Sequence, residues 1–259
     1  MKICALSSGS KGNCTYIENE NIAIIVDNGL TLKDFLARVE KANIDINKIK
    51  GILVTHEHID HIKGVGMLSR KLDIPIYAHT QIWDFLKCKL GKLDDCNCKQ
   101  ITEEAFEIED IGVQPFRVPH DAIYTLGYSL SCDSQKVSVA TDLGIANKGI
   151  INNLKGSQKV LLEANHDVQM LKNGSYPQYL INRILGNNGH LSNDNCSKVA
   201  VELATYGMEK LILGHLSMEN NSPEVAFDTV ATEFKRNNIV EGKQVDLLVA
   251  SQIKATSLI

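Results

Sequence analysis

Residues 51–61 read Gly-Ile-Leu-Val-Thr-His-Glu-His-Ile-Asp-His. An apolar run typical of a buried strand ends there in three imidazoles and two carboxylates within six positions. Side chains on a loop at a strand end can converge on one point, whereas those inside a strand alternate between two faces. Because imidazole nitrogen and carboxylate oxygen suit zinc, manganese or iron, we expect a metal site in this loop. The alternative is a surface loop that is rich in histidine and binds nothing.

The chain has 259 residues, a hydrophobic fraction of 44% and a formal net charge of −4. No Pro-, Gly- or Ser-rich linker divides it, so we expect a single domain over residues 1–259. Since no block of like charge attracts nucleic acid as a whole, a polyanionic substrate has to be held by a local site. No apolar run approaches the roughly 20 residues of a membrane span, and the first residues do not form a signal peptide. We therefore expect a soluble, cytoplasmic protein without membrane partners.

Seven cysteines are scattered along the chain, and their odd number favours reduced thiols over a disulfide framework. Cys88, Cys96 and Cys98 could form a structural metal site if a fourth ligand came from elsewhere. Ordinary thiols in a variable loop are the alternative that we favour.

Short β-type runs alternate with helical patterns along the whole chain. The predicted strands are Ile3–Leu6, Ala23–Val26, Ile52–Val54, Ile76–Ala78, Val113–Phe116, Leu126–Leu130, Val137–Ala140, Val160–Leu162, Leu211–Leu213 and Leu247–Val249. Thr31 is a candidate N-cap for a first helix. Further helices are predicted at Ile62–Leu72, Tyr179–Leu185, Cys196–Tyr206 and Glu224–Arg236. Two β-rich halves with helices outside them predict a layered α/β sandwich.

Further polar residues follow three of the predicted strands, namely His120-Asp121, Asp142 and His215. The ends of strands are where proteins built on sheets gather their chemistry. Each of these residues alone is a weak signal. Together with the first motif, four segments supply five histidines and two aspartates, enough for two metal ions if one carboxylate bridges them. Two metals about 3.5 to 4 Å apart can activate water and stabilise the attacking and leaving oxygens, which suits hydrolysis of a phosphodiester.

With these motifs in this order, nearly the whole chain resembles the metallo-β-lactamase fold, a four-layered αβ/βα sandwich that holds its metals at one edge of the two sheets. The resemblance implies two divalent metal ions: zinc, manganese or iron. It assigns one metal to His56, His58 and His120, the other to Asp60, His61 and His215, and the bridging position to Asp142. The nucleases and thioesterases of that superfamily share the combination of His61 with Asp142, so a hydrolase is implied.

A narrower resemblance concerns the YycJ family of bacterial proteins, also called WalJ. It is carried by Ser7–Cys14, Thr55–Gly64, His120-Asp121-Ala122, Leu162–Asp167, Tyr176-Pro177, Gly189–Asn193 and Gly214–Ser217. The resemblance implies a 5′-to-3′ exonuclease, an exodeoxyribonuclease whose partner is double-stranded DNA with a 5′ end and whose role lies in DNA repair.

Glu163 and His190 are similar to a carboxylate and a histidine that, in the tRNase Z branch, form a relay with the aspartate at the position of Asp60. The resemblance implies that His190 protonates the leaving oxygen while Glu163 orients and charges the imidazole. The alternative for His190 is a helix-capping or supporting role beside Gly189.

The loop from Ser7 to Asn13 carries hydroxyl groups, glycines and one lysine after a predicted strand. Its backbone N–H groups and side chains could hold a phosphate, although it is not a Walker loop, and the alternative is a tight connection between strands. By resemblance to related exonucleases, residues of a second region complete a pocket for a terminal phosphate. The candidates for this pocket are Ser7, Ser8, Ser10, Lys11, Asn13, Ser192, Asn193 and Ser217.

Two histidines remain unassigned: we expect His79 outside the ligand set and His166 near the mouth of the site. Three alternatives to a DNA exonuclease stay open, namely an RNA phosphodiesterase, a thioesterase of the glyoxalase II type, and a metal-stabilised scaffold. The physiological metal and the oligomeric state cannot be read from these residues, since several metals accept the same nitrogen and oxygen ligands.

Overall fold

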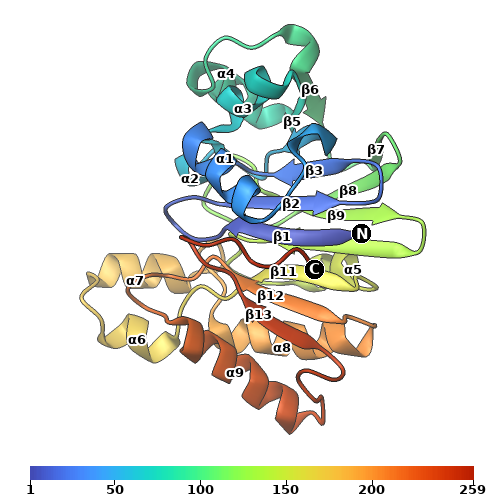
Figure 1. Ribbon diagram of the computed structural model, residues 1–259. Helices are drawn as coiled ribbons and strands as arrows, with labels where there is room; N and C mark the ends of the chain where they lie inside the picture. Colours follow the sequence, from blue (N-terminus) through green and yellow to red (C-terminus); the bar gives the residue numbers. More distant parts are fainter.

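The computed structural model describes residues 1–259 and consists of two β-sheets packed face to face (Figure 1). The first sheet has six strands, in the order β1 (Lys2–Ser7), β2 (Cys14–Glu18), β3 (Ala23–Val26), β4 (Ile49–Leu53), β5 (Ile76–His79) and β6 (Cys98–Ile101). The second has seven strands, in the order β13 (Asp246–Val249), β12 (Lys210–Gly214), β11 (Lys159–Glu163), β10 (Gln135–Ala140), β9 (Leu126–Cys132), β8 (Ile111–Arg117) and β7 (Phe106–Ile108).

Helices cover the outer faces of both sheets, which gives the predicted four layers (Figure 1). The helices that belong to the first half are α1 (Leu32–Lys41), α2 (Ile59–Ile62), α3 (Val65–Leu72) and α4 (Trp83–Lys89). Those of the second half are α5 (Lys148–Leu154), α6 (Val168–Asn173), α7 (Gln178–Leu185), α8 (Asn193–Thr205) and α9 (Pro223–Arg236). None of these helices combines the length and the apolar composition needed to cross a membrane.

The apolar residues of the inner strands alternate between two cores. In β11, Leu161 packs into the core between the sheets, whereas Val160 and Leu162 pack against α5, α8 and α9. Ile212 of β12 joins the inner core in the same way. Strands buried on both faces need continuous apolar runs, which explains the pattern of the sequence at these positions.

Parallel strands occur in both sheets and bring several chain segments to one edge of the sandwich. β3 pairs with β4 in parallel, and β10, β11, β12 and β13 pair in parallel in the other sheet. Residues that follow β3, β4, β10 and β12, together with the end of β11, meet at this edge, so the strand ends of both sheets supply side chains to one region.

Local sequence signals explain where several helices begin. The Thr31 hydroxyl accepts a hydrogen bond of 3.1 Å from the Asp34 backbone N–H, as expected for the N-cap of α1. Ser222 caps α9 in the same way and is followed by Pro223 at the first helical position. The predicted helices in the second half are confirmed with boundaries shifted by at most three residues.

The structure differs from the predicted single helix over Ile62–Leu72. One turn, α2, already begins at Ile59, and α3 starts only at Val65. Gly64 lies between them, so close to the loop before α1 that a Cβ would stand 2.0 Å from the Leu30 carbonyl oxygen. Strands β2, β6 and β7 and helices α4, α5 and α6 were not predicted, since they are short or lack a clear period.

Candidate metal centre

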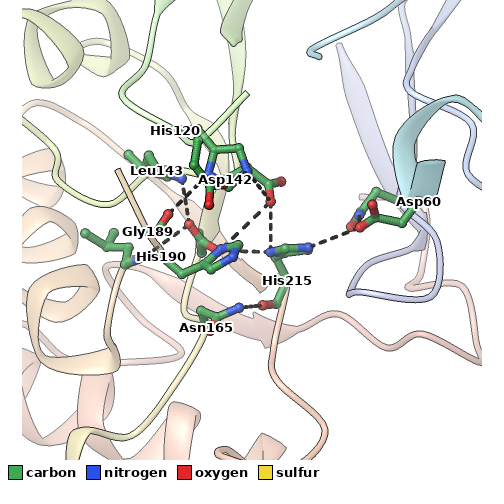
Figure 2. A network of polar contacts seen from close by, with 12 residues as sticks. Asp60, His120, Asp142, Leu143, Asn165, Gly189, His190 and His215 are labelled. Atoms are coloured by element: carbon green, nitrogen blue, oxygen red, sulfur yellow. Dashed lines mark hydrogen bonds and ion pairs between the residues drawn. The ribbon is translucent and has the colours of Figure 1, made fainter. Parts of the chain in front are cut away.

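The edge where the strand ends meet carries a dense cluster of histidines and carboxylates. Asp60 projects from α2, on the side of the first sheet, toward His120, Asp142, His190 and His215 on the side of the second sheet (Figure 2). His56 and His58 lie in the loop between β4 and α2. The motif is therefore not a loop throughout, because Asp60 and His61 stand on a helical turn that aims both side chains at the same point.

The structure forms four overlapping groups of side chains that could hold a metal, each with ligand atoms within 4.8 Å of one another. The first two are His56, His58 and His120, and Asp60, His61 and His215. The others join Asp142 to both sides, as His56, His61 and Asp142, and as Asp142, Glu163, His190 and His215. The first two groups coincide with the two ligand sets implied by the resemblance, and Asp142 lies between them.

Four buried polar atoms in this cluster lack any hydrogen-bond partner: Nε2 of His56, Nε2 of His120, Nε2 of His215 and Oδ2 of Asp142. A buried donor or acceptor left unpaired costs about 1 to 3 kcal/mol, so four at one place need a common explanation. Cations coordinated by these nitrogen and oxygen atoms supply one, and the residues present therefore fit a metal centre.

Burial lowers the pKa of His56 and of His120 and keeps their imidazoles neutral, as a metal ligand must be. Burial also acts to lower the pKa of His61 and of His215, but neighbouring carboxylates outweigh this effect. Asp142 and Asp27 raise the pKa of His61, and the nearby carboxylates of Asp142, Asp60 and Glu163 raise that of His215 to about 10. A bound cation would have to displace these protons.

Asp27 orients His61 from behind. Its Oδ2 accepts from the Thr55 hydroxyl at 2.7 Å and lies 2.7 Å from Nδ1 of His61, while Oδ1 accepts from the Thr55 backbone N–H. With Nδ1 held in this way, Nε2 is the nitrogen that faces Asp60 and Asp142. Carboxylates that fix a ligating imidazole are a regular part of metal sites.

Three of the residues at this edge have left-handed backbone conformations: Asp27, Asp142 and His215, with φ of 59°, 58° and 54°. Each follows closely on the end of a strand, and the positive φ turns its side chain out of the strand direction toward the cluster. Such conformations are uncommon outside glycine and concentrate at functional sites. The His215 backbone is held by the Ser8 hydroxyl at its N–H and by the Asn165 side chain at its carbonyl.

Glu163 is buried at the end of β11 and binds two imidazoles at once. Its Oε1 lies 2.7 Å from Nδ1 of His190 and 2.9 Å from Nδ1 of His215. Its Oε2 accepts backbone N–H groups from Leu143 and Leu191. Although burial acts to raise the pKa of Glu163, the two histidines lower it to about 2, so the carboxylate stays charged.

His190 combines a fixed orientation with an exposed side. Burial acts to lower its pKa, but the Glu163 carboxylate outweighs this and raises it, which favours the protonated ring at neutral pH. With Nδ1 bound to Glu163, the proton on Nε2 is the one that can be transferred. The side chain is 24% exposed, compared with 0% for Glu163, so it is the solvent-facing member of the pair.

Asp60 is connected to Glu163 and His190 only through His215. Its Oδ2 lies 3.8 Å from Nε2 of His215, whose other nitrogen faces Glu163. The amide of Asn13 lies 3.3 Å from Oδ2 of Asp60 and 2.9 Å from Nε2 of His61. Asn13, from the Ser7–Asn13 loop, therefore belongs to the surroundings of the predicted second metal.

The other phosphate-pocket candidates fall into two groups. Four have side chains engaged within the protein: Ser7 donates to the Gly12 carbonyl, Ser8 accepts from His215, Ser192 caps α8, and Asn193 pairs with Asn221. Ser10 and Lys11 are exposed, and Ser217 is half-buried. Ser10 and Lys11 have side chains that are free to meet a ligand from solvent, whereas the Ser217 hydroxyl already accepts a hydrogen bond of 3.1 Å from the Asn220 backbone N–H.

The remaining histidines lie outside the four groups. His79 stacks on Tyr124, with ring centroids 3.5 Å apart. His166 is only 1% exposed and does not line an open mouth, although Glu163 and His190 are among the charges that act on it. None of the four groups contains a cysteine, and all seven cysteines are unpaired.

Residues that the sequence analysis did not single out support the ligands. Asp27 is one, and the rule used for Asp142, an acid just after a strand, would have found it. Glu57 is another: its buried Oε1 accepts the Ile123 N–H at 2.7 Å and so ties the His120 loop to the first motif. No sequence pattern predicts that contact, because the two segments are 66 positions apart.

Comparisons with known proteins point to one superfamily and one fold. The model of the beta-lactamase superfamily domain matches residues 23–216. Exodeoxyribonuclease YycJ of Bacillus anthracis is 34% identical over 243 residues, which cover 93% of this chain and 92% of that protein. Exodeoxyribonuclease WalJ of Streptococcus pneumoniae R6 is 34% identical over 261 residues, covering 99% and 97%. The metallo-beta-lactamase fold protein YhfI from Bacillus subtilis, 14% identical, shares the fold with a TM-score of 0.72 over 98% of both chains.

Proposed function

The chain belongs to the β-lactamase superfamily and, within it, to the family of the exodeoxyribonucleases YycJ and WalJ, and from this premise we propose that it is a two-metal phosphodiesterase that degrades double-stranded DNA from the 5′ end. The Glu163–His190 pair beside the four unpaired ligand atoms is the observation that carries the proposal. This pair adds a proton donor to the metal centre, and a protein that serves only as a scaffold does not need a proton donor.

In this proposal His56, His58 and His120 hold one cation, Asp60, His61 and His215 hold the other, and Asp142 contributes to both. Two divalent cations supply Lewis acidity, which makes water nucleophilic at neutral pH and stabilises charge on the attacking and leaving oxygens. Asp27 keeps His61 aimed at the centre, and Glu163 does the same for His215.

His190 acts on the leaving oxygen. Glu163 raises the pKa of the ring and so favours its charged form, whose Nε2–H is free to donate a proton as the ester bond breaks. Afterwards the neutral ring takes up a proton from solvent through its exposed side. General acid catalysis of this kind contributes about 10²- to 10⁴-fold in rate.

Three substrates test the proposal on purified protein loaded with manganese or zinc: 5′-phosphorylated duplex DNA, RNA of the same sequence, and a glutathione thioester. We expect release of nucleotides from the 5′ end of the duplex, with slower turnover of RNA and none of the thioester. Preferred hydrolysis of RNA would move the function to an RNA phosphodiesterase. Preferred hydrolysis of the thioester would assign it to the glyoxalase II type.

The proposal includes a cytoplasmic location and a role in DNA repair. Seven unpaired cysteines support a reducing compartment. The role in repair is supported by the resemblance to the YycJ and WalJ family.

A further inference from the structure

Helices α6 and α7 form a lobe that projects from the sandwich at the same edge as α2 (Figure 1). The chain returns from α7 to His190 through Gly186–Gly189, and this return is packed tightly against the metal-centre loops. A Cβ on Gly144 would stand 2.2 Å from the Asn187 carbonyl oxygen. The Gly189 carbonyl lies 3.2 Å from Nδ1 of His120. The C-terminal end of α7 is therefore fixed beside the centre.

One basic side chain of this lobe reaches the centre. Nε of Arg183 donates to Oδ2 of Asp121, and Oδ1 of the same carboxylate lies 3.4 Å from Nε2 of His120. The Asp121 carboxylate therefore lies between the Arg183 guanidinium and Nε2 of His120, a member of the first ligand group. The Arg183 side chain is 60% exposed, so it is free to exchange this partner for one that arrives from solvent.

Arg183 is a cation beside a centre that carboxylates surround. Asp27, Asp60, Asp142 and Glu163 surround the cluster, and the whole chain carries a net charge of −4. The other ion pairs of lysine or arginine lie on other parts of the molecule. A strand that enters the site needs a cationic partner for the phosphates that the metals do not contact. A guanidinium fits that task, because it binds phosphate through two parallel hydrogen bonds.

Tyr179 stands one helical turn before Arg183 on α7. Side chains four residues apart in a helix lie on one face, about 5 to 6 Å apart at Cβ. Ile181, on the opposite face, is buried, whereas Tyr179 is exposed to solvent. The Tyr179 side chain is 74% exposed, compared with 47% for Tyr206 and 36% for Phe85, the other exposed aromatic residues.

We propose that Arg183 and Tyr179 form a nucleotide-binding ridge on α7, in which Arg183 binds a phosphate next to the scissile one and Tyr179 stacks on a base of the same strand. The inference rests on the proposed function, since it names the groups that would hold the nucleic acid at that centre. Stacking of a base on an aromatic ring accepts every base, as an exonuclease requires. Arg183 exchanges Asp121 for the phosphate when the strand enters.

Binding is measured first, by fluorescence anisotropy of a 5′-phosphorylated oligonucleotide with protein treated with a chelator, so that turnover plays no part. We expect Arg183→Gln and Tyr179→Ala each to weaken binding by about 10-fold, and Tyr179→Phe to bind like the wild type. The matched controls are Arg236→Gln and Tyr206→Ala. These residues lie at the C-terminal ends of α9 and α8, about 20 Å along each helix from the end near the site.

Two modified substrates distinguish a direct contact with the nucleic acid from a role of these residues in stabilising the fold. A methylphosphonate next to the scissile position removes the phosphate charge, and we expect it to abolish the difference between Arg183→Gln and the wild type. An abasic nucleotide removes the stacking base and should abolish the effect of Tyr179→Ala. Equal losses on modified and unmodified strands, or thermal midpoints below those of the controls, would make both residues structural and overturn the inference.

The outcomes also separate this inference from the proposed function. If the wild type cleaves DNA and all variants bind and cleave alike, only the nucleotide-binding ridge is wrong. If the wild type binds the strand through both residues but cleaves none with manganese or zinc, the exonuclease proposal fails and the ridge stands. If the wild type neither binds nor cleaves the strand, both the exonuclease proposal and the nucleotide-binding ridge are wrong.

Discussion

Oε1 of Glu163 lies 2.7 Å from Nδ1 of His190, and this buried carboxylate links the proposed metal centre to the proposed proton donor. The same oxygen lies 2.9 Å from Nδ1 of His215, a predicted metal ligand. One side chain thus orients two imidazoles with different tasks. Removing His190 should therefore affect chemistry alone, whereas changing Glu163 should affect both chemistry and metal binding.

The variant His190→Ala should lose about 10²- to 10⁴-fold in kcat while its metal content, measured by elemental analysis, stays near two ions per chain. Glu163→Gln should lose activity and also bind metal about 10- to 100-fold more weakly, since it no longer fixes His215. Loss of metal from His190→Ala would instead identify His190 as a ligand and exclude its role as the proton donor.

Asp27→Asn should weaken metal binding by about 10- to 100-fold without contacting the metal, because the carboxylate that fixes Nδ1 of His61 is lost. Competition with a chromophoric chelator measures the affinity. Asp228→Asn, an exposed aspartate of α9, is the matched control and should bind metal like the wild type. Equal affinities for both variants would contradict the orienting role of Asp27.

Removal of metal should lower the stability of the protein, since the unpaired Nε2 atoms of His56, His120 and His215 then remain buried without partners. A cation present at 100 times its Kd should stabilise the folded state by about 2.7 kcal/mol. Differential scanning calorimetry with chelator, and then with added zinc or manganese, measures the shift in Tm. An unchanged Tm would count against a preformed metal site.

His166 should make stability depend on pH. Burial lowers the pKa of its imidazole from 6.5 to about 4, so between these values the unfolded chain binds a proton that the folded chain does not. The stabilising effect is fully present above pH 6.5 and is lost as the pH falls toward 4. Urea unfolding of the wild type and of His166→Gln should therefore show a stability difference that moves in favour of the variant on acidification. A constant difference would show that His166 does not titrate in this range.

Substrates that end in a 5′-phosphate should be degraded faster than those that end in a 5′-hydroxyl if the Ser7–Asn13 loop and Ser217 hold the terminal phosphate. Lys11→Gln should reduce this preference, since Lys11 is an exposed cation of that loop. Initial rates on both ends, for wild type and variant, measure the effect. Equal rates on both ends of the wild type would remove the pocket from the proposal.

Local patterns of the sequence predict much of the fold. The long second-half helices have clear starting signals, such as Ser222 before α9, and the apolar runs of β11 and β12 mark strands buried on both faces. Strand β2 was not predicted, although all five of its residues are buried. Its burial depends on packing between the sheets, which short patterns do not encode.

The sequence by itself determined the chemical types at the centre: His56, His58, Asp60 and His61 are close along the chain, and Asp142 and His215 each follow an apolar strand. Only the tertiary structure decided which atoms face one another. Asp27 meets His61 across 34 positions, Glu163 meets His215 across 52, and Arg183 meets Asp121 across 62. These contacts arise because parallel strands from two sheets end at one edge, and that arrangement depends on the packing of the whole core.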